Sequence, residues 1–514
     1  MFSRVLKFFS IILYCFFFLY LYSMIMMNSD ENRSYIYALL PEYIFLYLFT
    51  GLFIYSFFVE LTRDDCFLAY TMIMILTVFQ YVHILEVGNY VNLDYWYVDK
   101  LSIYIKILLF IIVYIVLLVM YLLENKNSEI YLDFSFLSLI LLLLFGILVF
   151  VSTNNLFVIY LGIELQSLAL YILCGSNRYS IKSVEASLKY YIYGSFSSLV
   201  LLLGISFIYL SLGTLNLYEI NLLINSDFIY NKDVDIWLLN AGFIFILAGF
   251  FFKLAIAPFH WWLVEIFEGS PDIIVFFLAV VPKLPFFFVL YRLNKYIFIS
   301  FFYFSYIFII CGLLSVIIGT ILALYTIKMK KLLAYSSIVH MGYMIIALGI
   351  SSAMSIVFSF FYFIIYLLLT INIFYIYLLL RSSHNIIFSN ITDLSYLKNS
   401  NKLLAIITVV YLLSLAGIPP FMGFFGKLFI FNLLIDSGNY FICLLLLLLS
   451  ILSCVYYIRL IRFIFFDDKT ENPIAFQKNE SRYIYILISC FFLLNLIFFF
   501  IQEPLLLYII YIFS

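Results

Sequence analysis

Five ionisable side chains stand inside long apolar segments of this 514-residue sequence: Glu164, Lys189, Lys253, Lys283 and Lys427. A charged group at the centre of a membrane helix costs about 2.5–3.5 kcal/mol on insertion scales. Burial disfavours the charged form of a lysine, whereas a nearby carboxylate favours it. A buried lysine whose carboxylate neighbour comes and goes can therefore take up and release protons. These residue types predict a row of proton-exchanging sites.

Two of these lysines lie beside proline breaks. Lys253 is in GFIFILAGFFFKLAIAPFHWWLVE, where Pro258 follows it, and Lys427 is in LSLAGIPPFMGFFGKLFIF, where Pro419 and Pro420 precede it. Proline removes a backbone donor, and a helix break at mid-membrane usually lines a polar cavity. Two interrupted helices, one in each half of a chain, are typical of transporters built from inverted repeats. The order of lysine and proline differs between the two segments, so these segments alone do not establish a repeat.

The other charges need separate interpretations. Glu164 stands near the middle of its apolar segment without a local partner, so we interpret it as a functional carboxylate. Lys189 follows Glu185 by four residues on one helix face, and it is either a local ion-pair partner at a helix entrance or a functional group. Lys106 lies near a helix start, so we expect its ammonium group to snorkel toward the membrane surface.

Two histidines and one lysine complete the candidates. Lys283 is bracketed by Pro282 and Pro285, and His260 and His340 lie within or near apolar segments. A lone histidine in such a place is more often a hydrogen-bonded packing residue, yet its ionisation near neutral pH suits a proton relay. Both interpretations stay open at this point. No group of residues in the sequence has metal-ligand spacing.

The composition is that of a membrane protein. The chain is 67% hydrophobic and 11% charged, with a net charge of −1. That balance, without a basic stripe or a glycine-rich phosphate loop, argues against nucleic acid and nucleotide binding. The seven cysteines have no CxxC-type spacing for metal or redox chemistry. The 61 Phe and 46 Tyr residues fit an AT-rich gene and favour encoding in an organelle.

Hydropathy predicts fifteen membrane spans. They lie near residues 8–27, 42–60, 67–84, 98–122, 132–152, 154–175, 185–213, 236–260, 272–292, 298–326, 331–351, 354–381, 401–436, 440–466 and 481–502. We interpret the first as an uncleaved anchor because no small-residue cleavage site follows it. Alternating sides through these spans gathers most loop Lys and Arg residues on one side, including those at 176–184, 327–331 and 467–481. The positive-inside rule predicts that this side faces the matrix or cytoplasm.

Four segments resemble one family closely. They are LGIELQSLALYILCGSNRYSIKSVEASLKYYIYGSFSS, FKLAIAPFHWWLVEIFEGSPD, KKLLAYSSIVHMGYMI and LSLAGIPPFMGFFGK, in that order. Together they resemble NADH–quinone oxidoreductase subunit 2, the subunit N of bacterial complex I. The resemblance runs from about Pro41 to Phe466.

The resemblance implies an all-α polytopic membrane protein with an antiporter-like fold. That family has about fourteen transmembrane helices that contain two inverted five-helix repeats, each with a broken helix. We therefore expect an antiporter-like proton-translocating core at 41–466, an extra N-terminal transmembrane segment at 1–40, and a matrix loop with a C-terminal transmembrane helix at 467–514.

The resemblance also implies site residues. The essential glutamate of the family matches Glu164, and its membrane lysines match Lys189, Lys253, Lys283 and Lys427. One departure concerns the loop after the first break. Where the family usually has a proline and an acidic residue, this chain reads WWLVE, with a valine in place of the proline and a glutamate as the acidic partner.

The family's setting supplies the implied partners and cofactors. The chain would be a subunit of the proton-translocating NADH:ubiquinone reductase, in contact with membrane lipids and with the neighbouring subunits 4 and 4L. NADH, FMN, iron–sulfur clusters and ubiquinone would belong to other subunits. The expected location is the mitochondrial inner membrane, with the N-terminus on the matrix side and the C-terminus on the intermembrane side.

Two other classes stay open. The chain could serve a multisubunit cation/proton antiporter, although the motifs above resemble subunit 2 more closely. It could also be a structural scaffold of the membrane arm whose lysines are only packed and paired. A scaffold would lose assembly and pumping equally when those lysines are neutralised.

Overall fold

The computed structural model describes most of the chain. The described residues are 33–58, 62–87, 91–92, 96–124, 133–225, 235–298, 301–379, 390–467 and 482–513. The predicted first span, 8–27, and nearly all of the predicted loop 467–481 lie outside these residues.

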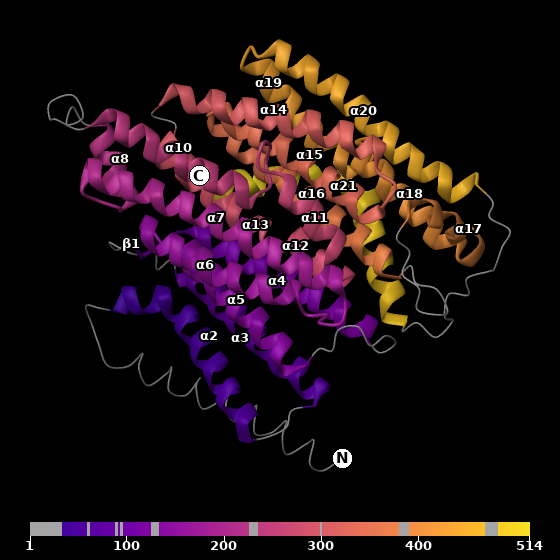
Figure 1. Cartoon of the computed structure of the whole chain (residues 1–514), viewed down its shortest axis with the longest axis horizontal. Helices are drawn as coiled ribbons and strands as arrows, with labels where there is room; N and C mark the ends of the chain where they lie inside the picture. Colours follow the sequence, from indigo (N-terminus) through magenta and orange to yellow (C-terminus); the bar gives the residue numbers. More distant parts are fainter. Residues whose placement is uncertain are drawn as a thin grey trace. The chain divides into compact units, whose positions relative to one another are not determined.

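The described part is almost entirely helical (Figure 1). The helices are α2 (Arg33–Phe58), α3 (Arg63–Val87), α4 (Lys100–Glu124), α5 (Phe134–Ser152), α6 (Leu156–Cys174), α7 (Ile181–Leu212), α8 (Leu217–Asn225), α10 (Ile236–Lys253), α11 (Trp261–Gly269), α12 (Asp272–Val280), α13 (Lys283–Tyr296), α14 (Phe302–Tyr325), α15 (Met329–Gly349), α16 (Ala353–Leu379), η2 (Ile391–Ser395), α17 (Tyr396–Ser400), α18 (Lys402–Ala416), α19 (Met422–Asp436), α20 (Tyr440–Phe465) and α21 (Arg482–Phe513). Two short antiparallel strands, β1 (Val91–Asn92) and β2 (Tyr97–Val98), pair with Val91 opposite Val98.

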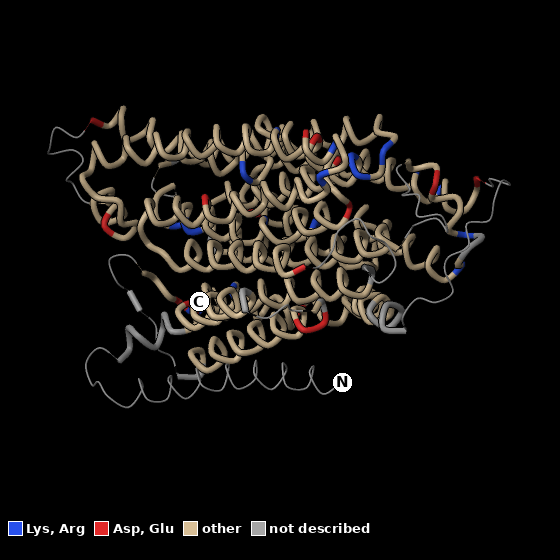
Figure 2. The backbone as a smooth tube through the Cα atoms, turned by 60° about the horizontal axis from the view of Figure 1, so that its bottom comes forward, with Lys and Arg blue, Asp and Glu red and all other residues tan. Residues whose placement is uncertain are grey.

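Within the described residues, twelve helices are long and apolar enough to cross a membrane. Charged residues are sparse along these helices (Figure 2). The long helix α2 and the pair α18–α19, which a break divides, are the further elements that correspond to predicted spans. The expected all-α polytopic membrane architecture is therefore confirmed.

Three predicted spans are interrupted. The two proline segments break as expected, between Lys253 and Trp261 and between Ala416 and Met422. The span predicted as continuous at 272–292 also breaks, because α12 ends at Val280 and α13 begins at Lys283. Pro282 and Pro285 explain this difference, since neither can donate the backbone hydrogen bond that would continue α12.

The chain divides into two compact units. One contains 1–177 and 198–246, and the other contains 178–197 and 247–514. In the first unit, α5 and α6 cross at Gly146 and Gly162, where a Cβ atom on either glycine would lie 2.9–3.0 Å from the backbone of the other helix. In the second, α14 and α15 cross in the same way at Gly312 and Gly342.

The order of elements repeats after each glycine crossing. The pair α5–α6 is followed by the long helix α7, the broken helix α10–α11 and then α12–α13. The pair α14–α15 is followed by the long helix α16, the broken helix α18–α19 and then α20. Two successive groups of five spans, each with its fourth span broken, agree with the expected five-helix repeats.

Contacts between loops support the predicted alternation of the spans. On one predicted side of the first unit, Trp96 bridges to Thr153, and Asn155 bridges to Asn216. On the other predicted side, in the second unit, Lys330 contacts Ser270 and Lys398 donates to the carbonyl of Phe465. Each contact joins two loops that the span count assigns to the same side.

Candidate functional site

The first break follows Lys253, the last residue of α10. The chain from Leu254 to His260 leaves the helix, with Ala255 in the left-handed region at a φ of 57°. A helix end leaves carbonyl groups without partners. Here the carbonyl of Phe252 accepts from the amide of Ala255 at 3.0 Å and from the indole nitrogen of Trp262 at 2.8 Å. The break is therefore a turn stabilised by specific hydrogen bonds. It holds Lys253 at a helix C-terminus, where a positive charge is favoured.

Aromatic stacking fixes α11 after the break. The ring of Trp262 stacks on Phe252 at a centroid distance of 5.9 Å and on Tyr190 of α7 at 5.2 Å. His260 is buried at the start of α11, and its ring lies 5.0 Å from that of Trp261. These contacts tie α7, α10 and α11 together on the side of Lys253.

Lys189 is held between two carboxylates. Its Nζ lies 2.8 Å from Glu185, one turn earlier in α7, and 3.0 Å from Glu265 of α11. The local ion pair that the sequence allows is therefore present. The contact with Glu265 adds a tie across two helices that the spacing alone did not indicate. Glu265 is the acidic residue that follows the valine where the resembled family has proline.

The second break ends α18 with a glycine. Gly417 has a φ of 87°, and the amide groups of Gly417 and Ile418 both donate back to Leu413. This left-handed ending satisfies carbonyl groups of the last turn. The next helix starts at Met422, whose amide donates to the side chain of Asn495 in α21 at 3.3 Å. A helix 73 residues further along the chain thus caps α19.

Lys427 points back into the second break. Its Nζ donates to the carbonyl of Ala416, the last residue of α18, at 2.7 Å, and lies 3.5 Å from the hydroxyl of Ser453. A Cβ atom on Gly417 would lie 2.9 Å from Cδ of Lys427. Gly417 therefore provides both the turn and the room for the lysine. The ammonium group sits at the negative end of α18.

His340 joins tyrosines from two other helices. Its Nδ1 lies 2.7 Å from the hydroxyl of Tyr362 in α16, and its Nε2 lies 3.2 Å from the hydroxyl of Tyr457 in α20. Both ring nitrogens are thus engaged in a buried site. The ring of Tyr362 lies against Gly426, the neighbour of Lys427, where a Cβ atom would be 2.1 Å from the ring.

Lys283 reaches the same cluster from the third break. Its Nζ donates to the hydroxyl of Tyr366 at 3.0 Å, and the Tyr366 ring lies 5.4 Å from that of His340. Tyr366 follows Tyr362 by one turn of α16. The structure therefore brings Lys283, His340 and Lys427 into one buried polar cluster, which we call the tyrosine cluster; its hydroxyl groups come from Tyr362, Tyr366 and Tyr457. These three tyrosines were not among the residues predicted from the sequence.

Glu164 lies in the other compact unit. It is half-buried on α6, and its backbone carbonyl accepts from the hydroxyl of Ser167 at 3.0 Å. Its Oε1 is buried and forms no hydrogen bond with the residues that the structure describes. Glu164 is therefore a carboxylate in the middle of a membrane-spanning helix, and its Oε1 has no hydrogen-bond partner among the described residues.

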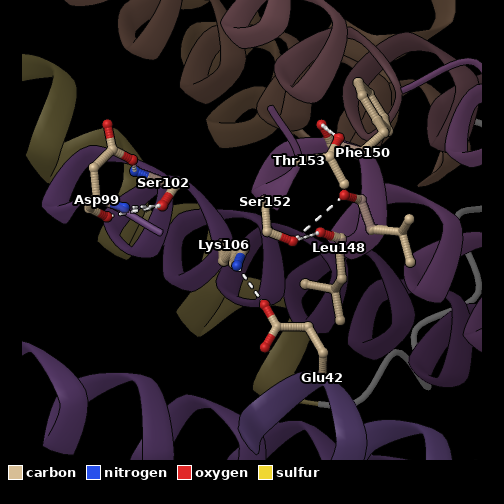
Figure 3. Close-up of polar contacts among 9 residues, drawn as sticks. Glu42, Asp99, Ser102, Lys106, Leu148, Phe150, Ser152 and Thr153 are labelled. Atoms are coloured by element: carbon tan, nitrogen blue, oxygen red, sulfur yellow. Dashed lines mark hydrogen bonds and ion pairs between the residues drawn. The ribbon is translucent and has the colours of Figure 1, made fainter. Parts of the chain in front are cut away.

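One expectation was wrong. Lys106 does not snorkel, because its side chain is buried at 1% exposure and forms an ion pair with Glu42 of α2 (Figure 3). The partner stands 64 residues earlier in the chain. A buried carboxylate lowers the cost of the buried ammonium, so the lysine has no need to reach the membrane surface.

Comparison with known proteins places these features in a family. The family model described as "NADH:quinone oxidoreductase/Mrp antiporter, TM" matches residues 152–453. NADH-quinone oxidoreductase subunit N of Pelagibacter ubique is 37% identical over 343 residues, which are 65% of this chain and 69% of that protein. NADH-ubiquinone oxidoreductase chain 2 of Marchantia polymorpha is 36% identical over 366 residues, which are 70% of this chain and 73% of that protein.

A solved structure agrees. A chain in the respiratory complex I from Thermus thermophilus matches with a TM-score of 0.74 and 25% sequence identity. The match covers 91% of this chain and 98% of that chain. The match therefore extends well beyond residues 152–453 at both ends.

Proposed function

This chain belongs to the antiporter-like membrane-subunit family of complex I, as a relative of subunit N and chain 2, and on that premise we propose that it conducts protons across the membrane. It is a multi-pass subunit of the membrane arm of a respiratory oxidoreductase complex. The observation that carries the proposal is the tyrosine cluster. It gathers His340 and Lys283 among buried tyrosine hydroxyl groups, and Gly426, the neighbour of Lys427, lies against the ring of Tyr362.

His340 can pass a proton from one side of its ring to the other. A neutral imidazole has one N–H donor and one acceptor nitrogen, so one of its two tyrosine partners accepts and the other donates. A proton that enters at one nitrogen and leaves from the other reverses the tautomer. A half-turn of the ring, with both hydroxyl groups reoriented, restores the starting arrangement. Beside this relay, Lys283 donates to the hydroxyl of Tyr366, whose ring lies 5.4 Å from that of His340.

The two helix breaks would be the end points of proton transfer. Lys253 is the last residue of α10, and the ammonium group of Lys427 reaches the C-terminal end of α18, so each lysine lies at a helix break where water can accept its proton. We propose that Glu164, Lys189, Lys253, Lys283 and Lys427 are the proton-translocating residues, with His340 and His260 as relays. His340 has the stronger support, because both of its ring nitrogens are engaged by hydroxyl groups.

A coupled switch between Glu164 and Lys253 supplies the driving step. A carboxylate near the lysine favours its protonated form, and separation of the two releases the proton. Moving one charge against 150–200 mV costs about 3.5–4.6 kcal/mol, at about 2.3 kcal/mol per 100 mV. The affinity of the lysine for its proton must therefore change by a free energy of about this size between the two states of the switch.

The other parts of the proposal concern the setting. NADH, FMN, iron–sulfur clusters and ubiquinone would be bound by other subunits, so this chain contributes proton movement and no redox step. Subunits 4 and 4L would be its neighbours. The chain would lie in the mitochondrial inner membrane, with the loops at 176–184, 327–331 and 467–481 on the matrix side.

The test compares Lys253→Ala and Glu164→Gln with the wild-type complex in sealed vesicles. We expect the complex to assemble while the proton-to-electron ratio and the coupled NADH–quinone turnover fall. Lys295→Ala, at an exposed position, is the control and should leave both unchanged. Normal assembly with a wild-type ratio in either variant would refute the switch. If assembly falls in proportion to pumping, the chain is a structural scaffold. If the chain is absent from the native-gel band that has NADH dehydrogenase activity, it belongs to a separate antiporter complex.

A further inference from the structure

The helices that precede the family-matched region contain a second buried acid–base group. Each of α2, α3 and α4 contributes one polar side chain to it: Glu42, Tyr81 and Lys106 (Figure 3 shows the two charged members). Glu42 and Lys106 are 5% and 1% exposed, and Tyr81 is fully buried. Nζ of Lys106 lies 5.2 Å from the centre of the Tyr81 ring.

An apolar wall surrounds this group. The ring of Phe110 lies 5.9 Å from that of Phe45 and 6.1 Å from that of Tyr81, so aromatic rings close the space between the three helices. The helix α5 packs against α2, α3 and α4 and contains no ionisable residue. Among the described residues, the ionisable side chains that interact with Glu42 are Lys106 of α4 and Tyr81 of α3.

The pair is only partly satisfied. Oε1 of Glu42 bonds to Lys106, but Oε2 is buried and completes no hydrogen bond within the described residues. The hydroxyl of Tyr81 is also buried and completes no close hydrogen bond there, but Glu42 acts on it both by its charge and as a looser hydrogen-bond partner. A pair that served only to fix the helices would gain by completing the bonds of both oxygens, since an unpaired buried acceptor is destabilising.

We propose that Glu42, Tyr81 and Lys106 form an additional proton-exchanging site, which rests on the proposed function of the chain as a proton conductor. In a low-dielectric bundle, a proton can move from Nζ of Lys106 to the carboxylate of Glu42, which turns the ion pair into two neutral groups. The carboxylic acid then carries the proton that the ammonium has lost, and the total charge is unchanged. A proton from outside can then bind at Oε2 while the proton on Oε1 returns to Nζ of Lys106, which leaves Glu42 neutral and Lys106 charged; loss of the Oε2 proton restores the ion pair.

The experiment measures protonation directly in the whole complex. Infrared difference spectra between acid and alkaline pH should contain a carboxyl band that disappears in Glu42→Gln and shifts in Glu42→Asp. Lys106→Met should move the pH at which this band changes, whereas Lys100→Met, at the exposed start of the same helix, should not. Absence of any band that responds to Glu42→Asp would overturn the proposal, because this variant keeps the pair intact.

A second measurement separates the site from a simple helix lock. The double variant Glu42→Gln/Lys106→Met removes both charges together, so it leaves no unpaired buried charge. We expect the assembled double variant to lose coupled proton uptake. Assembly with a wild-type proton-to-electron ratio would show that the pair only fixes the helices. A failure of Lys253→Ala to affect pumping would instead contradict the proposed function, so the two failures are distinguishable.

Discussion

Nζ of Lys427 donates a hydrogen bond of 2.7 Å to the carbonyl oxygen of Ala416, the residue at which α18 ends. The lysine therefore belongs as much to the end of α18 as to its own helix, α19. Its position depends on the shape of the turn between the two helices.

Gly417→Ala should disturb Lys427 as well as the turn. An added Cβ atom would press on the lysine side chain at 2.9 Å, and a left-handed conformation costs a non-glycine residue about 1–2 kcal/mol. We expect both thermal stability and coupled proton pumping to fall. Gly438→Ala is the matched control, because Gly438 has a similar φ of 75° and open space around it. Equal losses of pumping in the two variants would mean that backbone strain alone is responsible.

Tyr362→Phe and Tyr457→Phe should slow proton transfer through His340. Each substitution removes one of the hydroxyl groups that engage the ring, while the aromatic packing is kept. We expect assembled complexes with a lower coupled NADH–quinone turnover, measured in sealed vesicles. Tyr411→Phe is the control, because that hydroxyl is buried and makes no hydrogen bond within the described chain. Unchanged turnover in both cluster variants would exclude this route.

Asn495→Leu should loosen the start of α19 and so displace Lys427. Loss of a side-chain cap typically costs about 0.5–2 kcal/mol of helix stability. We expect reduced pumping, with recovery in Asn495→Asp, whose side chain can still accept from the amide of Met422. Phe498→Leu, on the same helix and packed against Phe425, is the control for lost packing alone. The same loss in Asn495→Asp and Asn495→Leu would argue against a capping role.

Acidification should weaken the tie between α11 and α15. Burial tends to raise the pKa of Glu268, but hydrogen bonds from Lys328 and Lys331 outweigh it and hold that pKa below its ordinary value. A lowered folded-state pKa adds stability above the unfolded-state value, and this stability is lost as the pH falls through the folded-state value. Hydrogen exchange of residues 261–269, corrected for intrinsic rates, should therefore quicken in acid.

Two variants check that interpretation. Glu268→Gln should exchange quickly at neutral pH already and change little on acidification. Glu219→Gln, an exposed acid on α8, should behave like the wild-type chain. An acid response of the same size in Glu268→Gln would show that another group is responsible.

The sequence predicted the helices well because most spans are long and uniformly apolar. It predicted the breaks at Pro258 and Pro419 for the same local reason, since proline acts on its own helix. The break at 281–282 was foreseeable from Pro282 and Pro285, but mean hydropathy does not register a missing donor. Helices and helix breaks were therefore predictable from the sequence wherever the residues that cause them lie within one or two turns.

The partners of the charges were much less predictable. Glu42 and Lys106 stand 64 residues apart, and no local pattern relates them. Tyr362 and Tyr366 share a helix face at a spacing of four, yet with 46 tyrosines in the chain that spacing is not distinctive. Nothing in the sequence around Asn495 indicates that it caps α19. Each of these depends on which helices pack together, and that is set by the whole chain.

The glycine crossings bear on where the subunit can move. Backbones that touch at Gly146 and Gly162, or at Gly312 and Gly342, cannot slip past each other by a fraction of a turn without a collision. Each of these helix pairs is therefore a rigid element within its own unit. The turns around Ala255 and Gly417 are short irregular stretches, where small changes in φ and ψ suffice to swing a segment. Gating motions should begin at these two hinges, each of which holds one of the membrane lysines.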